Sequence, residues 1–139
     1  MKLAALFLSM LLISSTQAPP QDDARKDLEK FQGNWLILTM NGQSVPPEAE
    51  AYLVFNGDKY EQWTGNDVSE RGSFKVDVKA KPMTIDLIIT EGNDAGHTQL
   101  GLVEFANDVM TVGFAAPGVT TRPATLDQAE LWATLKKTK

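Results

Sequence analysis

The residues that could perform chemistry in this chain are few and lie far apart. His97 is the single histidine, and the chain has no cysteine. A hydroxyl nucleophile is usually activated by a histidine, and thiol chemistry needs a cysteine. Because His97 follows Gly96 in a loop of turn-forming residues, we expect it to be a solvated side chain at a strand edge. The sequence therefore lacks the pattern of a nucleophilic hydrolase.

Paired carboxylates could serve acid–base catalysis or bind a metal if they were buried close together. Asp86 shares strand parity with Thr84 and Thr90, opposite an apolar face, so we expect it to point at solvent. Glu104 lies in a mixed strand near a turn. The turns supply only fragments of a calcium loop, namely Asn93-Asp94 and Asp67 with Glu70. We therefore expect no enzyme, no metal site and no cofactor.

From about residue 55 to residue 135, short alternating apolar runs are separated by turn dipeptides. Phe74/Val76/Val78 is one such run, and alternation of this kind puts one side of each strand in a core. The turns carry Asn, Gly and Asp, which tolerate the positive φ of tight hairpins. They are Asn56-Gly57, Asn66-Asp67, Asn93-Asp94 and Asn107-Asp108. This pattern predicts an antiparallel, all-β body.

The elements expected from this pattern are one short helix followed by eight strands. The helix is predicted over residues 24–31, with Leu28 and Phe31 on the face that docks. Strands are predicted over 33–40, 53–55, 59–63, 71–78, 83–90, 98–105, 109–114 and 129–137, with a short helix or capping loop over 45–51. Pairing of the first strand with the last would close an eight-stranded antiparallel barrel and remove its edges. A two-sheet sandwich satisfies the same pattern.

The N-terminus predicts export. Leu3–Ile13 is an apolar run that follows Lys2, and about eleven residues span only ~16 Å as a helix, too short to cross a bilayer. We expect a signal peptide over residues 1–18, a flexible tether over 19–23 and the barrel domain over 24–139, with no membrane span after cleavage. Without a cysteine there is no thiol to carry a lipid. The periplasm, the cell envelope or the exterior of a bacterium is the expected location.

The charge balance argues against nucleic acid as a partner. Removal of residues 1–18 removes Lys2 and changes the formal net charge from −5 to −6. An acidic protein is repelled by phosphate backbones.

Several stretches of the sequence are similar to those of a known family. Gly33-Asn34-Trp35 after a short helix is similar to the Gly-x-Trp signature of lipocalins and the wider calycins. From about Leu28 to Lys137 the chain resembles the uncharacterised lipocalin-like domain of planctomycete bacteria. The matching stretches are Gln32–Trp35, Asn56–Tyr60, Ile85–Gly92 and Phe114–Gly118, with Arg122-Pro123 after them. The resemblance implies a lipocalin-like barrel and transfers no activity.

The resemblance also implies a role for Trp35. In lipocalins the corresponding tryptophan plugs the closed end of the barrel beneath a basic side chain just after the last strand. Lys136 and Lys137 are the candidates, and Lys137 shares parity with Leu135. Lipocalins usually have arginine at this position, and lysine stacks less well on an indole.

An eight-stranded barrel is just wide enough inside for side chains or for one small ligand. The residues expected to point inward are apolar and include aromatic and methionine side chains, which suit a hydrophobic ligand. They are Trp35, Phe55, Trp63, Phe74, Met83, Leu87, Met110 and Phe114. The same residues could instead fill a solid core. Arg122 could offer its fork to a carboxylate at the rim, or it could be an ordinary loop arginine.

Two functions follow from these expectations. The first is an exported, non-enzymatic barrel that binds a small hydrophobic ligand in the bacterial envelope. The alternative is a solid barrel that acts as a protein-interaction or structural module at the cell surface. An exposed apolar patch formed by Leu36, Leu38 and Ile88 would favour the alternative.

Overall fold

The structure, a computed structural model, describes residues 21–138 and, for side chains, Arg25 onward. The predicted signal peptide and residues 19–20 of the predicted tether lie outside these residues. Helix α1 spans Gln21–Glu29, so the expected tether over 21–23 is wrong in that part. Within residues 21–138, no helix is long and apolar enough to cross a membrane.

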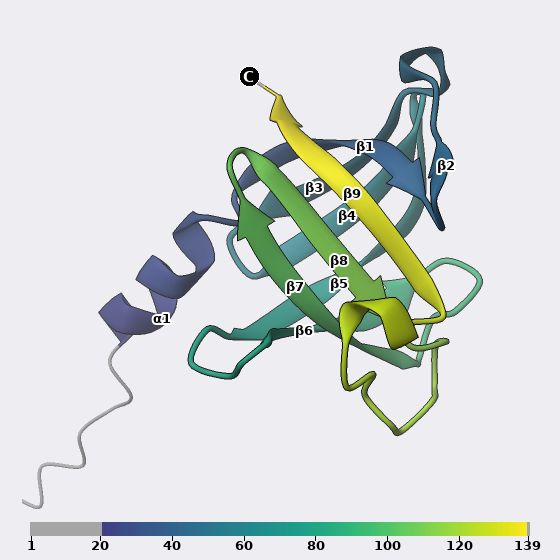
Figure 1. The fold of residues 1–139 in the computed structure, drawn as a ribbon. Coiled ribbons are helices and arrows are strands. Elements are labelled where there is room, and N and C mark those ends of the chain that lie inside the picture. Colours follow the sequence, from purple (N-terminus) through teal and green to yellow (C-terminus); the bar gives the residue numbers. More distant parts are fainter. Residues whose placement is uncertain (1–20, 139) are drawn as a thin grey trace, which may run out of the picture.

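Nine strands follow α1 in the described part of the chain, and each pairs antiparallel with its neighbours (Figure 1). They are β1 (Gly33–Met40), β2 (Gln43–Ser44), β3 (Ala51–Asn56), β4 (Lys59–Thr64), β5 (Asp67–Asp77), β6 (Met83–Glu91), β7 (Thr98–Ala106), β8 (Val109–Phe114) and β9 (Leu131–Thr138). Short 3₁₀ turns, η1 (Pro47–Ala49) and η2 (Leu126–Gln128), precede β3 and β9.

The pairing of β1 with β9 closes the sheet into a barrel. It runs from Asn34 opposite Thr138 to Met40 opposite Ala133. Eight strands, β1 and β3 to β9, form the wall, and the two-residue β2 only extends one end of β1. The predicted eight-stranded antiparallel lipocalin-like barrel is confirmed, and the sandwich alternative is wrong.

The register of the β3–β4 hairpin corrects one expected orientation. A three-residue turn over 56–58 was expected, but the turn is the two residues Gly57 and Asp58, so that Phe55 lies opposite Tyr60. A change of register by one residue moves every side chain of a strand to the other face. Tyr60 and Gln62 therefore face the interior, and Trp63, expected inside, lies in a shallow groove on the outer wall.

Aromatic rings fill the end of the barrel next to α1. Phe31, directly after the helix, is fully buried, and its ring centroid lies 5.1 Å from that of Phe105 and 5.9 Å from that of Phe74. Leu28 of α1 packs against the same core, as expected. Trp35 donates a hydrogen bond from Nε1 to the Phe31 carbonyl oxygen over 2.7 Å. This end of the barrel is therefore closed.

The residues of the Gly-x-Trp segment meet partners from distant strands at this closed end. The Gln32 side chain donates to the Gly57 carbonyl oxygen (2.9 Å) and accepts from the Gly57 amide (2.7 Å). Gly33 has a φ of 110°, and a Cβ there would lie 3.1 Å from Lys137 Cε. The absence of that Cβ leaves room for Lys137, whose Nζ lies 6.0 Å from the centroid of the Trp35 ring. The closed end is thus formed by a contact between Trp35 on the first strand and Lys137 on the last strand of the barrel.

Because Trp35 plugs one end of the barrel and Trp63 does not, substitution of these two tryptophans should affect stability unequally. Trp35→Ala should lower the free energy of unfolding by about 3–5 kcal/mol, because it removes a buried indole and leaves a cavity. Trp35→Phe should cost about 1–3 kcal/mol, since the Phe31 carbonyl loses its donor. Urea unfolding would measure both.

The matched control is Trp63, which lies on the outer wall of the barrel. Trp63→Phe should change the unfolding free energy by less than about 1 kcal/mol, as is usual for surface substitutions. Equal effects of the two Trp→Phe variants would contradict the proposed plug.

Candidate functional site

A cavity of about 230 Å³ lies inside the barrel at the end opposite α1. Its lining comes from most of the strands and from two loops. The lining residues are Ile37, Met40, Leu53, Gln62, Glu70, Leu87, Asp94, Gln99, Val112, Phe114, Pro117, Leu131, Ala133 and Leu135. Apolar side chains predominate, and four polar residues interrupt them. The interior is therefore packed solid at one end and hollow at the other.

The residues expected to line a cavity are divided between these two halves. Leu87 and Phe114 line the cavity. Four others are buried in the core but do not line it, namely Trp35, Phe55, Phe74 and Met110. Met83 is half-buried at the packed end, where its sulfur lies 3.9 Å from Lys30 Nζ.

The polar lining residues were not expected from the sequence. They are Gln62 on β4, Glu70 on β5, Asp94 in the β6–β7 loop and Gln99 on β7. The alternation of residues along the strands could have identified two of them. Glu70 has the parity of Gly72 and Phe74, and Gln62 has that of Tyr60. Asp94 carried no such signal because it belongs to a loop.

Glu70 is held by a buried tyrosine. Tyr60, only 1% exposed, donates from its hydroxyl to Glu70 Oε2 over 2.9 Å. Burial raises the pKa of Glu70, and the nearby Asp94 carboxylate raises it further, while the Tyr60 hydrogen bond lowers it. Burial, followed by the charge of Glu70, also raises the pKa of Tyr60, which therefore stays a donor. The Glu70 carboxylate, which accepts this hydrogen bond at Oε2, thus faces the cavity.

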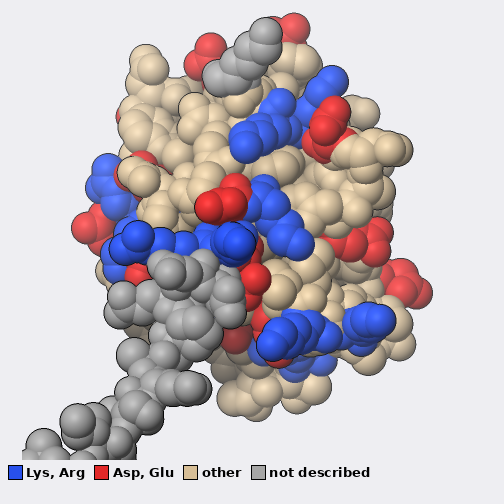
Figure 2. Space-filling view, turned by 90° about the vertical axis from the view of Figure 1, so that its left-hand side faces the viewer, with Lys and Arg blue, Asp and Glu red and all other residues tan. Residues whose placement is uncertain are grey.

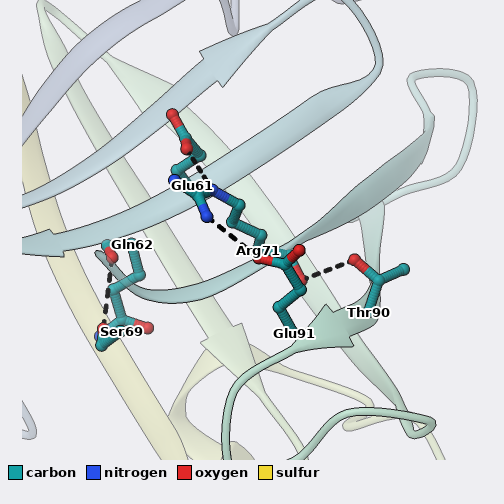
Figure 3. Close-up of polar contacts among 6 residues, drawn as sticks. All are labelled: Glu61, Gln62, Ser69, Arg71, Thr90 and Glu91. Atoms are coloured by element: carbon teal, nitrogen blue, oxygen red, sulfur yellow. Dashed lines mark hydrogen bonds and ion pairs between the residues drawn. The ribbon is translucent and has the colours of Figure 1, made fainter.

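Two β-bulges flank Glu70 and set its position. Ser69 is the extra residue of β5 opposite Gln62 and Trp63, and its hydroxyl donates to the Gln62 carbonyl oxygen over 3.2 Å. Thr90 is the extra residue of β6, and its hydroxyl donates to the Arg71 carbonyl oxygen over 3.1 Å. Figure 3 shows both contacts. Each hydroxyl satisfies a carbonyl of the adjacent strand where the bulge interrupts the ladder.

The loop after β6 brings Asp94 to the cavity. Gly92 has a φ of 116°, and a Cβ there would lie 2.7 Å from the Ser69 carbonyl oxygen, so the chain can cross β5 closely only with glycine. The Gly96 amide then donates to the Ile89 carbonyl oxygen over 2.9 Å, which folds the loop back on β6. Asp94 is half-buried within this loop and lines the cavity.

The arginines nearest to the cavity are engaged on the outer wall. Arg71, the neighbour of Glu70, points away from it and pairs with Glu61 (2.6 Å) and Glu91 (3.0 Å) (Figure 3). Arg122, for which the sequence left a rim position and an ordinary loop position open, donates to Asp86 (2.5 Å) and to the Gly101 carbonyl oxygen (2.8 Å). Arg122 is therefore a loop arginine that holds the outward-facing Asp86, and it does not line the cavity.

Few large apolar side chains are exposed on the described part of the surface. Leu36, Leu38 and Ile88 are half-buried, and Val119, 43% exposed, is the one large apolar side chain exposed within the described residues. Figure 2 shows basic and acidic side chains interspersed over one face of the barrel. The three side chains whose exposure would favour the alternative function are therefore only partly exposed.

His97 and the acidic turns form no further site among residues 21–138. His97 is exposed and does not line the cavity. The same residues contain no group of three His, Asp or Glu side chains placed to hold a metal ion. Comparisons with protein-family models, curated proteins and solved structures gave no match. The chemistry of the site must therefore be inferred from its geometry.

The raised pKa of Glu70 predicts a specific pH dependence of stability. The folded protein binds the Glu70 proton more tightly than the unfolded chain does, so the stability from this group is complete below the ordinary pKa of about 4.3. This contribution to stability is lost as the pH rises from about 4.3 through the raised pKa of Glu70. Glu70→Gln removes this titration. Its unfolding free energy relative to wild type should therefore rise across that window and then level off, as measured by urea unfolding at a series of pH values.

Tyr60→Phe provides the companion test. It removes the hydrogen bond that lowers the Glu70 pKa, so the upper end of the window should move to higher pH. A difference between Glu70→Gln and wild type that stays flat or falls with pH would contradict this assignment.

Proposed function

We propose that this protein is a non-enzymatic binding protein that holds one small, largely apolar molecule in the open half of its barrel. The cavity of about 230 Å³ is the observation that supports this function. Ligand sites are typically concave and apolar with a few well-placed polar groups, and this lining has that composition. The volume lies somewhat below the usual range of about 300–1,000 Å³, so the ligand is small.

The volume also sets an approximate ligand size. An apolar cavity of about 150 Å³ binds benzene, which has six non-hydrogen atoms. In proportion, 230 Å³ corresponds to about nine non-hydrogen atoms. A fatty acid of ordinary length exceeds this size, whereas a single ring with a short polar arm fits.

Binding explains the site better than catalysis does. The single histidine, His97, does not line the cavity, and the Glu70 carboxylate is hydrogen-bonded to Tyr60. No nucleophile with an adjacent base faces the cavity within the described residues. We assign the protein no reaction and no cofactor.

The proposal includes export to the bacterial envelope. The apolar segment Leu3–Ile13 after Lys2 supports a cleaved signal peptide, and the Gly-x-Trp segment supports membership of the lipocalin-like family. Bacterial expression from Met1 should yield a product in the periplasmic or extracellular fraction whose mass shows loss of roughly the first 18 residues. An intact chain retained in the cytoplasm would contradict export.

Filling the cavity should abolish binding. Ala133, 4% exposed, lies opposite Val112 and Met40 and lines the cavity, so Ala133→Leu places three additional carbon atoms in it. We expect at least a roughly tenfold loss of affinity for 2-phenylethanol, measured by calorimetry, since lost contacts of about 1.4 kcal/mol suffice. Ala133→Val, a smaller change, should give an intermediate loss.

Ala106→Leu is the matched control, because Ala106 is exposed at the end of β7 and does not line the cavity. Its affinity should equal that of wild type. Failure of wild type to bind any small ring compound, together with no ligand in solvent extracts of the purified protein, would overturn the proposed function.

A further inference from the structure

The polar groups in the cavity are two carboxylates and two side-chain amides, all of which carry acceptor oxygens. Glu70 and Asp94 both line the cavity with carboxylates. Burial raises the pKa of Glu70, and the charge of Asp94 raises it further. Gln99 donates its Nε2 to the Ala115 carbonyl oxygen over 3.1 Å, which leaves its Oε1 as an acceptor. Among residues 21–138, Tyr60 is the one donor to the Glu70 carboxylate, and it occupies Oε2. The second oxygen, Oε1, is left for a ligand.

Positive charge that could balance these carboxylates is missing from the lining. None of the 14 lining residues, all within the described part, is Lys or Arg. Arg71 is engaged by Glu61 and Glu91 on the outer wall, and Arg122 by Asp86. Two nearby carboxylates in a partly apolar site favour a cation between them, since ionisation of both is otherwise costly.

We propose that the ligand is a small organic amine, whose ammonium group is held by Glu70 and Asp94 and whose apolar body occupies the rest of the cavity. This inference rests on the proposed function and specifies its ligand class. An ammonium group has three N–H donors, which matches Glu70 Oε1, Asp94 and Gln99 Oε1 in number. The body contacts the apolar wall formed by Leu53, Leu87, Val112 and Phe114.

The same arrangement discriminates against other ligands of equal size. A carboxylate would meet two like charges and find no cation in the lining, so acidic ligands are disfavoured. A neutral alcohol fits the apolar wall but forms weaker hydrogen bonds with the carboxylates than an ammonium group does. Affinity should therefore decrease in the order amine, alcohol, carboxylate.

The test is calorimetry of the purified mature protein near neutral pH with three probes of matched shape: 2-phenylethylamine, 2-phenylethanol and phenylacetate. We expect the amine to bind roughly tenfold or more tightly than the alcohol, and phenylacetate to bind most weakly. Glu70→Gln and Asp94→Asn should each reduce the affinity for the amine roughly tenfold. The affinity for the alcohol should change by no more than about twofold.

Two variants with the same loss of charge serve as controls. Glu104→Gln and Asp108→Asn remove exposed carboxylates that do not line the cavity. Both should bind the amine as wild type does, which separates a local contact from general attraction by an acidic protein. If Glu70→Gln proves too unstable to assay, Asp94→Asn on the loop still tests the inference. Equal losses in the control variants would overturn it.

The outcomes separate this inference from the proposed function. If the alcohol binds in the cavity and the amine binds no more tightly, the amine assignment fails and the binding function stands. If neither these probes nor any other small ring compound binds, and solvent extracts of the purified protein contain no ligand, both fail. Preferential binding of phenylacetate would also overturn the amine assignment.

Discussion

The pairing of β1 with β9 is the constraint on which the rest of this structure depends. It joins the first and last strands of the barrel wall, so that no long strand edge is left unpaired. It also encloses an interior that must be filled by side chains or by water. Trp35 and Lys137 lie opposite each other in this pair, and the indole is anchored to the Phe31 carbonyl. The strand pairing that closes the sheet therefore also places the residues that close one end of the barrel. Phe31, which follows α1, takes part in this closure.

The interior is filled unequally because large and small residues are distributed unequally along the strands. Phe31, Phe55, Phe74 and Phe105 pack against one another near α1. Toward the other end, Ala133 and Val112 reach less far into the barrel, and polar side chains occupy inward positions of β4 and β5. Buried polar groups keep their partners or water, so this half cannot collapse into a dry core as the aromatic half does.

The acidic character of the open half changes what the barrel is suited to bind. The sequence predicts an apolar ligand lining and leaves Arg122 either at the rim or as an ordinary loop arginine. In the structure, Arg122 is bound to Asp86 outside the barrel, and Glu70 and Asp94 face the interior. The fold class agrees with expectation, whereas the two acidic residues of the cavity lining were not expected from the sequence.

Alternation of apolar residues and the positions of Asn, Gly and Asp determined the strands and their antiparallel succession, because these signals are local in the chain. A sandwich satisfied the same pattern, so the pairing of β1 with β9 that closes the barrel was decided by the tertiary structure. Parity also placed Leu87 and Phe114 inside. The tertiary structure alone decided the orientation of Trp63, since it depends on a hairpin register that differs by one residue from the expected one. It also decided that Glu70, Tyr60 and Asp94 meet, because two bulges and the crossing at Gly92 arise only when distant strands pair and compete for the same backbone hydrogen bonds.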